Sequence, residues 1–163
     1  GDFNKYTIEA VRIHKLPGYN NLIIRGSGQY SQDPLFIAEQ YTIGGAGSVR
    51  GFNPSTYSGD RGYTVSLELQ TSPILPDETI KILNNQKIGD TRKIALFADN
   101  GGVYRNDRQP GEAEDDYLTS IGAGIRVFHG KYLSAKLDYA LPEKKGDFKT
   151  ENSEIYAQAT VSF

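Results

Sequence analysis

The sequence lacks cysteine, tryptophan and methionine among its 163 residues, and it has no long apolar run. Without cysteine, this chain offers neither a disulfide framework nor thiol catalysis. The longest apolar runs are only a few residues, such as Leu22-Ile23-Ile24, whereas a transmembrane helix needs about 20. A formal net charge of −2 argues against nucleic-acid binding, because that activity needs a basic surface.

The length fits a single domain. The sequence begins Gly1-Asp2-Phe3, with no initiator methionine and none of the basic and apolar regions of a signal peptide. The chain is therefore either a mature protein or, as we expect, a piece of a longer one.

Alternation of apolar and polar residues recurs along most of the chain, whereas helical periodicity is nearly absent. The clearest case is the end of the chain, where Ile155, Ala157, Ala159, Val161 and Phe163 form an apolar face. The pattern predicts an all-β, antiparallel fold of eight strands, over residues 6–16, 19–31, 35–43, 65–70, 93–99, 120–127, 133–139 and 154–163.

The predicted links between these strands are of two lengths. The short ones are Leu16–Gly18, Ser31–Pro34 and His129-Gly130. The long ones, rich in Gly, Pro, Asp and Asn, are Gly44–Gly62, Pro73–Thr91, Asn100–Asp116 and Pro142–Ser153. Such asymmetry is typical of outer-membrane barrels, which have short periplasmic turns and long outer loops.

Two architectures fit this pattern. In a soluble sandwich the apolar faces pack on a second sheet, whereas in an up-and-down transmembrane β-barrel they meet lipid and the polar faces line a wet lumen. Strands of about 10–12 residues suit a tilted membrane crossing. Small residues and tyrosine on the apolar faces, such as Ala157, Ala159 and Tyr139, also favour the barrel.

The last strand carries a second indication. Its closing aromatic, Phe163, is in phase with the apolar stripe and resembles the assembly signal of outer-membrane barrels, which we assign to Phe163, Val161 and Tyr156. Val161 stands where that signal often has tyrosine. The alternative is a strand that happens to end in an aromatic residue.

The stretch GGAGSVRGF, residues 44–52, is the candidate functional loop. Its glycines disfavour strand and helix, because each loses much backbone freedom on ordering. Arg50 cannot shed its charge, so in a confined place it needs a carboxylate or several carbonyls as partners. Asp99, on the polar face of its predicted strand, is the best candidate, and Glu68 is a second. Alternatively, Arg50 is solvated and Asp99 caps a turn.

Other constellations predict no chemistry. His14 and His129 have neither cysteine nor regularly spaced carboxylates beside them, so neither a metal site nor a catalytic residue is predicted. The acidic run 112–116 lacks the ligand spacing of a calcium loop. Gly45-x-Gly47 lacks the spacing of a dinucleotide site, and we expect no cofactor.

Two motifs resemble those of a known family. The first comprises Gly44, Gly45, Val49, Arg50, Gly51 and Phe52, followed by GDRGY at 59–63 and by Glu68. The second is Phe97-x-Asp99-x-Gly101. Their wording, order and spacing are similar to the two-partner secretion transporters, the haemolysin activation/secretion proteins. These belong to a superfamily of outer-membrane barrels with polypeptide-transport-associated (POTRA) domains, and the resemblance covers nearly the whole chain.

The resemblance implies the C-terminal half of a sixteen-stranded barrel, with the POTRA domains and N-terminal strands absent from this sequence. Residues 44–61 would fold into the lumen, where Arg50 would meet Asp99 and Phe52 would wedge the tip. A half barrel leaves two open edges that lipid cannot satisfy. The piece would therefore close as a small eight-stranded barrel, pair with another copy, or belong to a longer chain.

The function implied is that of a translocator in the bacterial outer membrane, not an enzyme. It would secrete a large exoprotein, an adhesin or haemolysin, through the lumen. Its other partners would be outer-membrane lipid and, through the C-terminal strand, the barrel-assembly machinery. The alternatives are a barrel-assembly insertase of the same superfamily and a soluble β-sandwich binding module.

Overall fold

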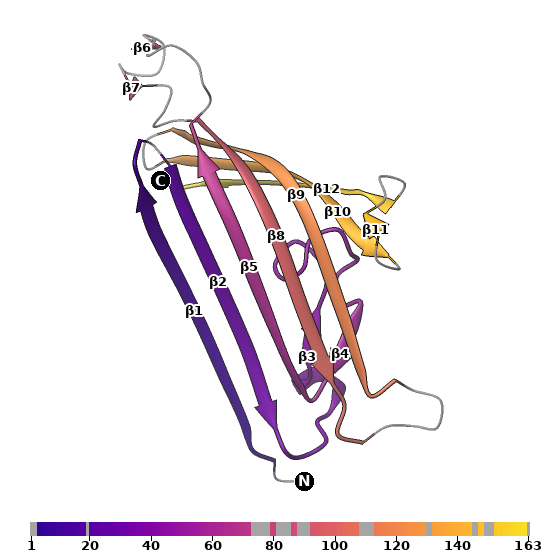
Figure 1. The fold of residues 1–163 in the computed structure, drawn as a ribbon. Helices are drawn as coiled ribbons and strands as arrows, with labels where there is room; N and C mark the ends of the chain where they lie inside the picture. Colours follow the sequence, from indigo (N-terminus) through magenta and orange to yellow (C-terminus); the bar gives the residue numbers. More distant parts are fainter. Residues whose placement is uncertain are drawn as a thin grey trace.

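The computed structural model describes residues 3–18, 20–72, 79–80, 86–87, 92–107, 113–129, 132–144, 147–148 and 152–162. One antiparallel sheet dominates it, with the long strands in the order β1-β2-β5-β8-β9-β10-β12 (Figure 1). These strands are β1 (Lys5–Leu16), β2 (Asn20–Ser31), β5 (Arg61–Thr71), β8 (Arg92–Tyr104), β9 (Asp115–His129), β10 (Leu133–Lys144) and β12 (Glu154–Val161). The predicted all-β antiparallel class is confirmed.

Shorter elements complete the structure. A 3-10 turn, η1 (Ile37–Glu39), precedes a small hairpin of β3 (Tyr41–Ile43) and β4 (Tyr57–Gly59). A second small hairpin pairs β6 (Thr79–Ile80) with β7 (Gln86–Lys87), and β11 (Asp147–Phe148) pairs with the end of β10. Among the described residues, no helix has the length and apolar character needed to cross a membrane.

The two faces of the main sheet differ in chemistry. Large apolar side chains stand exposed on the outer face, among them Leu67, Leu96, Ile125, Leu137 and Ile155. A soluble sandwich would bury such a face under a second sheet, and in the described part of the chain no sheet packs on it. The described part of the chain therefore does not have the second layer of a soluble β-sandwich, and an exposed apolar band of this kind is typical of the outer face of a barrel wall.

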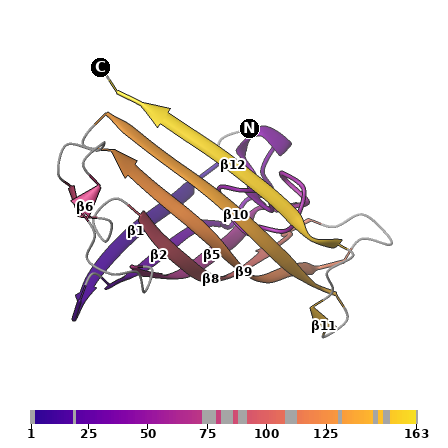
Figure 2. The same ribbon diagram turned by 90° about the horizontal axis from the view of Figure 1, so that it is seen from above.

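The sheet is curved into a trough, and the connection between β2 and β5 lies in its hollow (Figure 2). Its two edges are β1 and β12, and no ladder joins these strands in the part of the chain that the structure describes. Closure as a small eight-stranded barrel, one of the predicted alternatives, is not observed.

The strand predicted over residues 35–43 is found only at its end, where Tyr41–Ile43 form β3 and pair with β4 instead of joining the main sheet. The residue before this segment, Pro34, follows the end of β2, and Leu35 to Ala38 are four consecutive apolar residues without alternation. They form η1 and its flanks instead, because the hydrogen-bonded neighbour of β2 is β5. The Ser31–Pro34 joint is consequently no hairpin, and the inward connection runs over residues 32–60, wider than the predicted 44–61.

Short and long connections were expected at opposite ends of the sheet, but one end carries both kinds. The short β1–β2 and β9–β10 turns share one end of the sheet with the β5–β8 connection, which spans residues 72–91. The opposite end carries the β2–β5, β8–β9 and β10–β12 connections. The inner side chains of β5, β8, β9 and β10 thus face the β2–β5 connection across the trough.

Candidate functional site

The β2–β5 connection packs on the inner wall through a small apolar core. Ile43 and Val49 are fully buried against Val103 and Leu118, with Tyr41, Phe52 and Tyr57 packed around them. Val49 lies over Gly101, where an added Cβ would stand 2.9 Å from the Val49 Cγ2 atom. The glycine of the second motif therefore makes room for the residue before Arg50.

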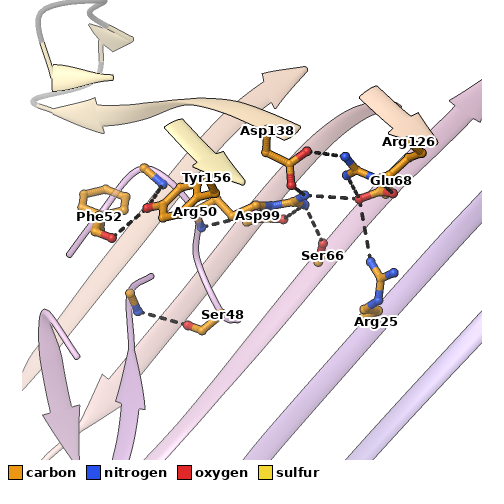
Figure 3. Close-up of polar contacts among 12 residues, drawn as sticks. Arg25, Ser48, Arg50, Phe52, Ser66, Glu68, Asp99, Arg126, Asp138 and Tyr156 are labelled. Atoms are coloured by element: carbon orange, nitrogen blue, oxygen red, sulfur yellow. Dashed lines mark hydrogen bonds and ion pairs between the residues drawn. The ribbon is translucent and has the colours of Figure 1, made fainter. Parts of the chain in front are cut away.

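Arg50 follows Val49 and reaches Asp99 on β8 (Figure 3). Its Nε and Nη2 atoms donate to the two carboxylate oxygens at 2.7 and 2.8 Å, and its backbone N–H donates to Oδ2 at 3.2 Å. Arg50 is 6% exposed and Asp99 is 2% exposed. This is a buried, bidentate, charge-assisted contact, the arrangement in which arginine binds carboxylate most strongly.

Four further wall residues surround the same guanidinium, and one of them, Ser66, accepts from Nη2 at 3.3 Å. Nη1 of Arg50 donates to Glu68 Oε2 and to Asp138 Oδ2, both at 3.2 Å. The guanidinium carbon lies 3.4 Å from the ring centroid of Phe97, which places a cation over an aromatic face. Each residue of the second motif thus has its own role at the tip. Phe97 stacks on the guanidinium, Asp99 pairs with it, and Gly101 leaves space for Val49.

A second buried arginine, Arg126 on β9, completes the network. It donates to Glu68 through Nη2 at 2.9 Å and Nε at 3.2 Å, and to Asp138 Oδ1 through Nη1 at 2.5 Å. Gln70 donates to Glu68 Oε1 at 2.7 Å. Arg126 therefore holds in place two of the three carboxylates that Arg50 contacts.

The charges in this cluster balance. The three carboxylates of Glu68, Asp99 and Asp138 meet the buried guanidiniums of Arg50 and Arg126, and Arg25, half exposed on β2, lies 3.9 Å from Glu68. Burial alone would lower the pKa of Arg50, but the hydrogen bond to Asp99 and the three negative charges outweigh it and raise that pKa above its ordinary value. Arg50 is therefore a permanent cation in the trough.

The tip of the connection continues from Arg50 to the last strand. Gly51 has a φ of 91°, and Gly44 and Gly45, before the tip, have φ of 110° and 92°, values that favour glycine. The Tyr156 hydroxyl on β12 accepts from the Gly51 N–H and donates to the Phe52 carbonyl, each at 3.0 Å. Phe52 is partly buried against the apolar core.

Two of the three residues of the predicted assembly signal lie in the described part of the structure. Tyr156 points inward to the tip of the connection, whereas Val161 is exposed on the apolar face of β12. Phe163 lies outside the described residues. The role of these residues in assembly stays a prediction.

The two ends of the connection meet at another buried carboxylate, that of Asp60, which is 2% exposed. Its Oδ1 accepts from the Leu35 N–H at 2.6 Å and its Oδ2 from the Asn106 N–H at 2.7 Å. The Asn106 side chain in turn donates to the carbonyls of Ser31 and Asp33, at 3.0 and 3.2 Å. Asp60 thus joins the start and the end of the β2–β5 connection to the neighbouring β8–β9 connection.

Two charged residues of the network around Arg50 were not predicted from the sequence, Arg126 and Asp138. Both lie on polar faces of predicted strands, which is the criterion that selected Asp99. The sequence signal was present, but the β9–β10 register that places Asp138 opposite Gly124 is needed to bring them together. In the described residues no group of three or more His, Cys, Asp and Glu is arranged to hold a metal ion.

Known proteins are similar to this chain in sequence and in fold. A family model described as haemolysin secretion/activation protein ShlB/FhaC/HecB matches residues 1–127. The outer membrane transporter CdiB of Dickeya dadantii (strain 3937) is 34% identical over 114 residues, which cover 63% of this chain and 20% of the transporter. The structure of CdiB from Acinetobacter baumannii matches with a TM-score of 0.67 at 18% identity, over 98% of this chain and 27% of that one.

The structural match, at this identity, concerns the fold alone. The chain spans about a fifth to a quarter of the length of these two relatives. Since the family model matches residues 1–127, which are more than half of the chain and include the Arg50 motif and the Phe97–Gly101 motif, the chain belongs to the haemolysin secretion/activation protein (ShlB/FhaC/HecB) family of the bacterial outer membrane.

Proposed function

We propose that this chain forms part of an outer-membrane translocator that secretes a large exoprotein, an adhesin or a haemolysin, through the barrel lumen. The observation that carries the proposal is the buried Arg50, fixed among Asp99, Glu68 and Asp138. These contacts hold residues 32–60 inside the trough, where a passing polypeptide would have to move beside or past them. Arg50 and Asp99 are the latch that sets the conducting conformation.

The inner wall supports this proposal by its chemistry. A cavity of about 660 Å³ lies beside the tip, and its lining mixes uncharged polar side chains, such as Ser66, Gln158 and Thr160, with the charged side chains of Glu9, Arg25, Arg50, Glu68, Arg126 and Lys136. The uncharged groups can exchange hydrogen bonds with an extended backbone, and Arg50 and Arg126 are already paired with Glu68. The arrangement suits the threading of an unfolded chain, and the proposal includes neither an enzymatic step nor a cofactor.

The partners follow from the two faces of the sheet. The secreted exoprotein would contact the inner face, and outer-membrane lipid would contact the exposed apolar face. The barrel-assembly machinery would engage the C-terminal strand. The matched family favours secretion over the alternative, an insertase that folds other barrels, because that family is described by haemolysin secretion.

The test uses Arg50→Ala and Asp99→Ala in the full-length protein, with exoprotein secretion and barrel insertion measured side by side. Removing one partner of a buried ion pair typically costs about 3–5 kcal/mol, and a wet lumen reduces this figure. We expect secretion to fall far more than insertion. Arg105→Ala is the matched control, because Arg105 pairs with Asp116 at 2.8 Å outside this cluster.

Normal secretion by both latch variants would contradict the latch. A loss of newly inserted barrels of other proteins, with secretion unchanged, would instead favour the insertase. Heat-modifiable migration on a gel reports insertion in each case.

A further inference from the structure

The last strand of the sheet, β12, has one inner contact that the charge network does not share. Among the described residues, β12 pairs only with β10, and every residue of β12 except Tyr156 is exposed. Glu68, Asp99, Arg126 and Asp138 come from β5, β8, β9 and β10. The ion pairs that hold Arg50 therefore leave β12 out.

Tyr156 connects β12 to the same tip by different chemistry. Its hydroxyl uses both of its capacities at the tip, accepting from the Gly51 N–H and donating to the Phe52 carbonyl, each at 3.0 Å (Figure 3). Pro142 of β10 also stands close to Gly51, and its nitrogen would lie 3.1 Å from an added Cβ. The tip is thus confined between the end of β10 and the start of β12.

We propose that Tyr156 is a positioning residue that makes the place of the tip depend on the place of β12. The hydroxyl bonds exist only while residues 51–52 and β12 keep their present separation, so movement of either one removes them. A tip that leaves the wall frees the inner face of β12, and a β12 that moves away from β10 releases one tether of the tip. This coupling is separate from the proposed secretion activity and is measured without it.

The experiment reads the tip with a buried cysteine, since this chain has no cysteine of its own. Val49→Cys, at a position that is fully buried, is labelled by a maleimide only after the tip leaves the wall. Ala46→Cys is exposed and serves as the reference for reagent access. Both are made in the full-length, membrane-inserted protein, alone and combined with Tyr156→Phe, which keeps the ring and removes the hydroxyl.

We expect Tyr156→Phe to raise the labelling rate of the Val49→Cys thiol roughly tenfold, as the loss of two neutral hydrogen bonds predicts. The labelling of the Ala46→Cys thiol should stay unchanged. Tyr63→Phe is the matched control, because the Tyr63 hydroxyl donates to Asn100 at 3.0 Å on the sheet itself. It is expected to change neither rate. A Tyr156→Phe rate equal to that of the parent would overturn the proposal.

Two further results decide the matter. Hydrogen exchange of the β12 amides is expected to speed up in Arg50→Ala as well as in Tyr156→Phe, because a released tip cannot bond Tyr156. Unchanged β12 exchange in Arg50→Ala contradicts the coupling. A Tyr156→Phe protein that loses heat-modifiable migration also contradicts it, since a tether is expected to leave insertion intact.

Discussion

The β2–β5 connection is fastened at two places, its tip and its base, and the two fastenings differ in kind. At the tip, a permanent cation meets three carboxylates from β5, β8 and β10. At the base, the single carboxylate of Asp60 accepts two backbone amides, one from the connection and one from the neighbouring loop. The tip is held by ion pairs between distant parts of the chain, and the base by capping of backbone amides.

This difference assigns a separate task to each place. The base determines where residues 32–60 leave β2 and return to β5, whatever the tip does. The tip determines whether the connection stays on the wall. If Arg50 left the cluster, three buried carboxylates would lose one of the cations that neutralise them, which is costly. Damage at the tip should therefore release the tip alone, and damage at the base should loosen the base alone.

The largest effect is expected from Asp138→Ala, which removes a partner of both Arg50 and Arg126. Such losses typically cost about 3–5 kcal/mol, here in the free energy that holds the tip. Maleimide labelling of Val49→Cys should speed up strongly, while that of Leu35→Cys, buried at the base, should stay slow. Equal labelling of both introduced thiols would show that tip and base are one unit.

A smaller effect, at the other place, is expected from Asp60→Ala. Two backbone amides each lose a bond to a charged group, worth about 1.5–3 kcal/mol, but the part-buried Asn106 amide can bond water instead. Leu35→Cys should now react faster and Val49→Cys should not. Asp33→Ala is the control, since the Asp33 carboxylate accepts from Asn4 in an exposed position. Faster reaction at the tip position alone would reverse the assignment.

Gly124→Ala tests the tip without changing a charge. A Cβ on Gly124 would collide with the Asp138 carboxylate and with Arg126, and overpacking typically costs about 1–3 kcal/mol. We expect the Val49→Cys thiol to react faster, though less than with Asp138→Ala. Gly26→Ala is the matched control, because the nearest atom to its added Cβ is 3.9 Å away. Identical labelling rates of the Val49→Cys thiol in Gly124→Ala and Gly26→Ala would show that β9 and β10 accommodate the added methyl group without loosening the tip.

The smallest effect is expected from Lys5→Ala. The Lys5 ammonium lies 2.6 Å from Glu39 beside the base, but both side chains are partly exposed, at 27% and 42%. Exposed pairs contribute about 0–1 kcal/mol and weaken in salt. Labelling of the Leu35→Cys thiol should rise slightly at low salt and not at all at high salt. A salt-independent rise would mean that Lys5 acts by packing.

The fold could be predicted to a large extent because its signal is local. Alternation over residues 154–163 and 133–139 reflects a sheet with one apolar, exposed face and one polar, inner face, so each strand carries its own evidence. Residues 35–40 were misassigned although Leu35 to Ala38 do not alternate, and the start of this segment is held by Asp60, whose contact with the Leu35 amide spans 25 residues. No pattern within residues 35–43 contains that information.

The site divides in the same way. Arg50 and Asp99 belong to sequence motifs, and their pairing was predicted because a confined arginine keeps its charge and needs a partner. Arg126 and Asp138 carry none, and their place depends on strand register. The Tyr156 contact depends in addition on the curvature of the sheet, which brings β12 over the tip of the connection (Figure 2).

The central claim is that the tip rests on the inner wall because Arg50 is paired there, and a disulfide tests it most directly. Val49→Cys and Gly101→Cys, combined in the full-length protein, place two thiols at a contact where the Val49 side chain and an added Cβ lie 2.9 Å apart. We predict rapid disulfide formation with a mild oxidant in the membrane, and its loss when Asp99→Ala is added. Two thiols that stay reduced and react freely with maleimide while Arg50 and Asp99 are intact would contradict the account.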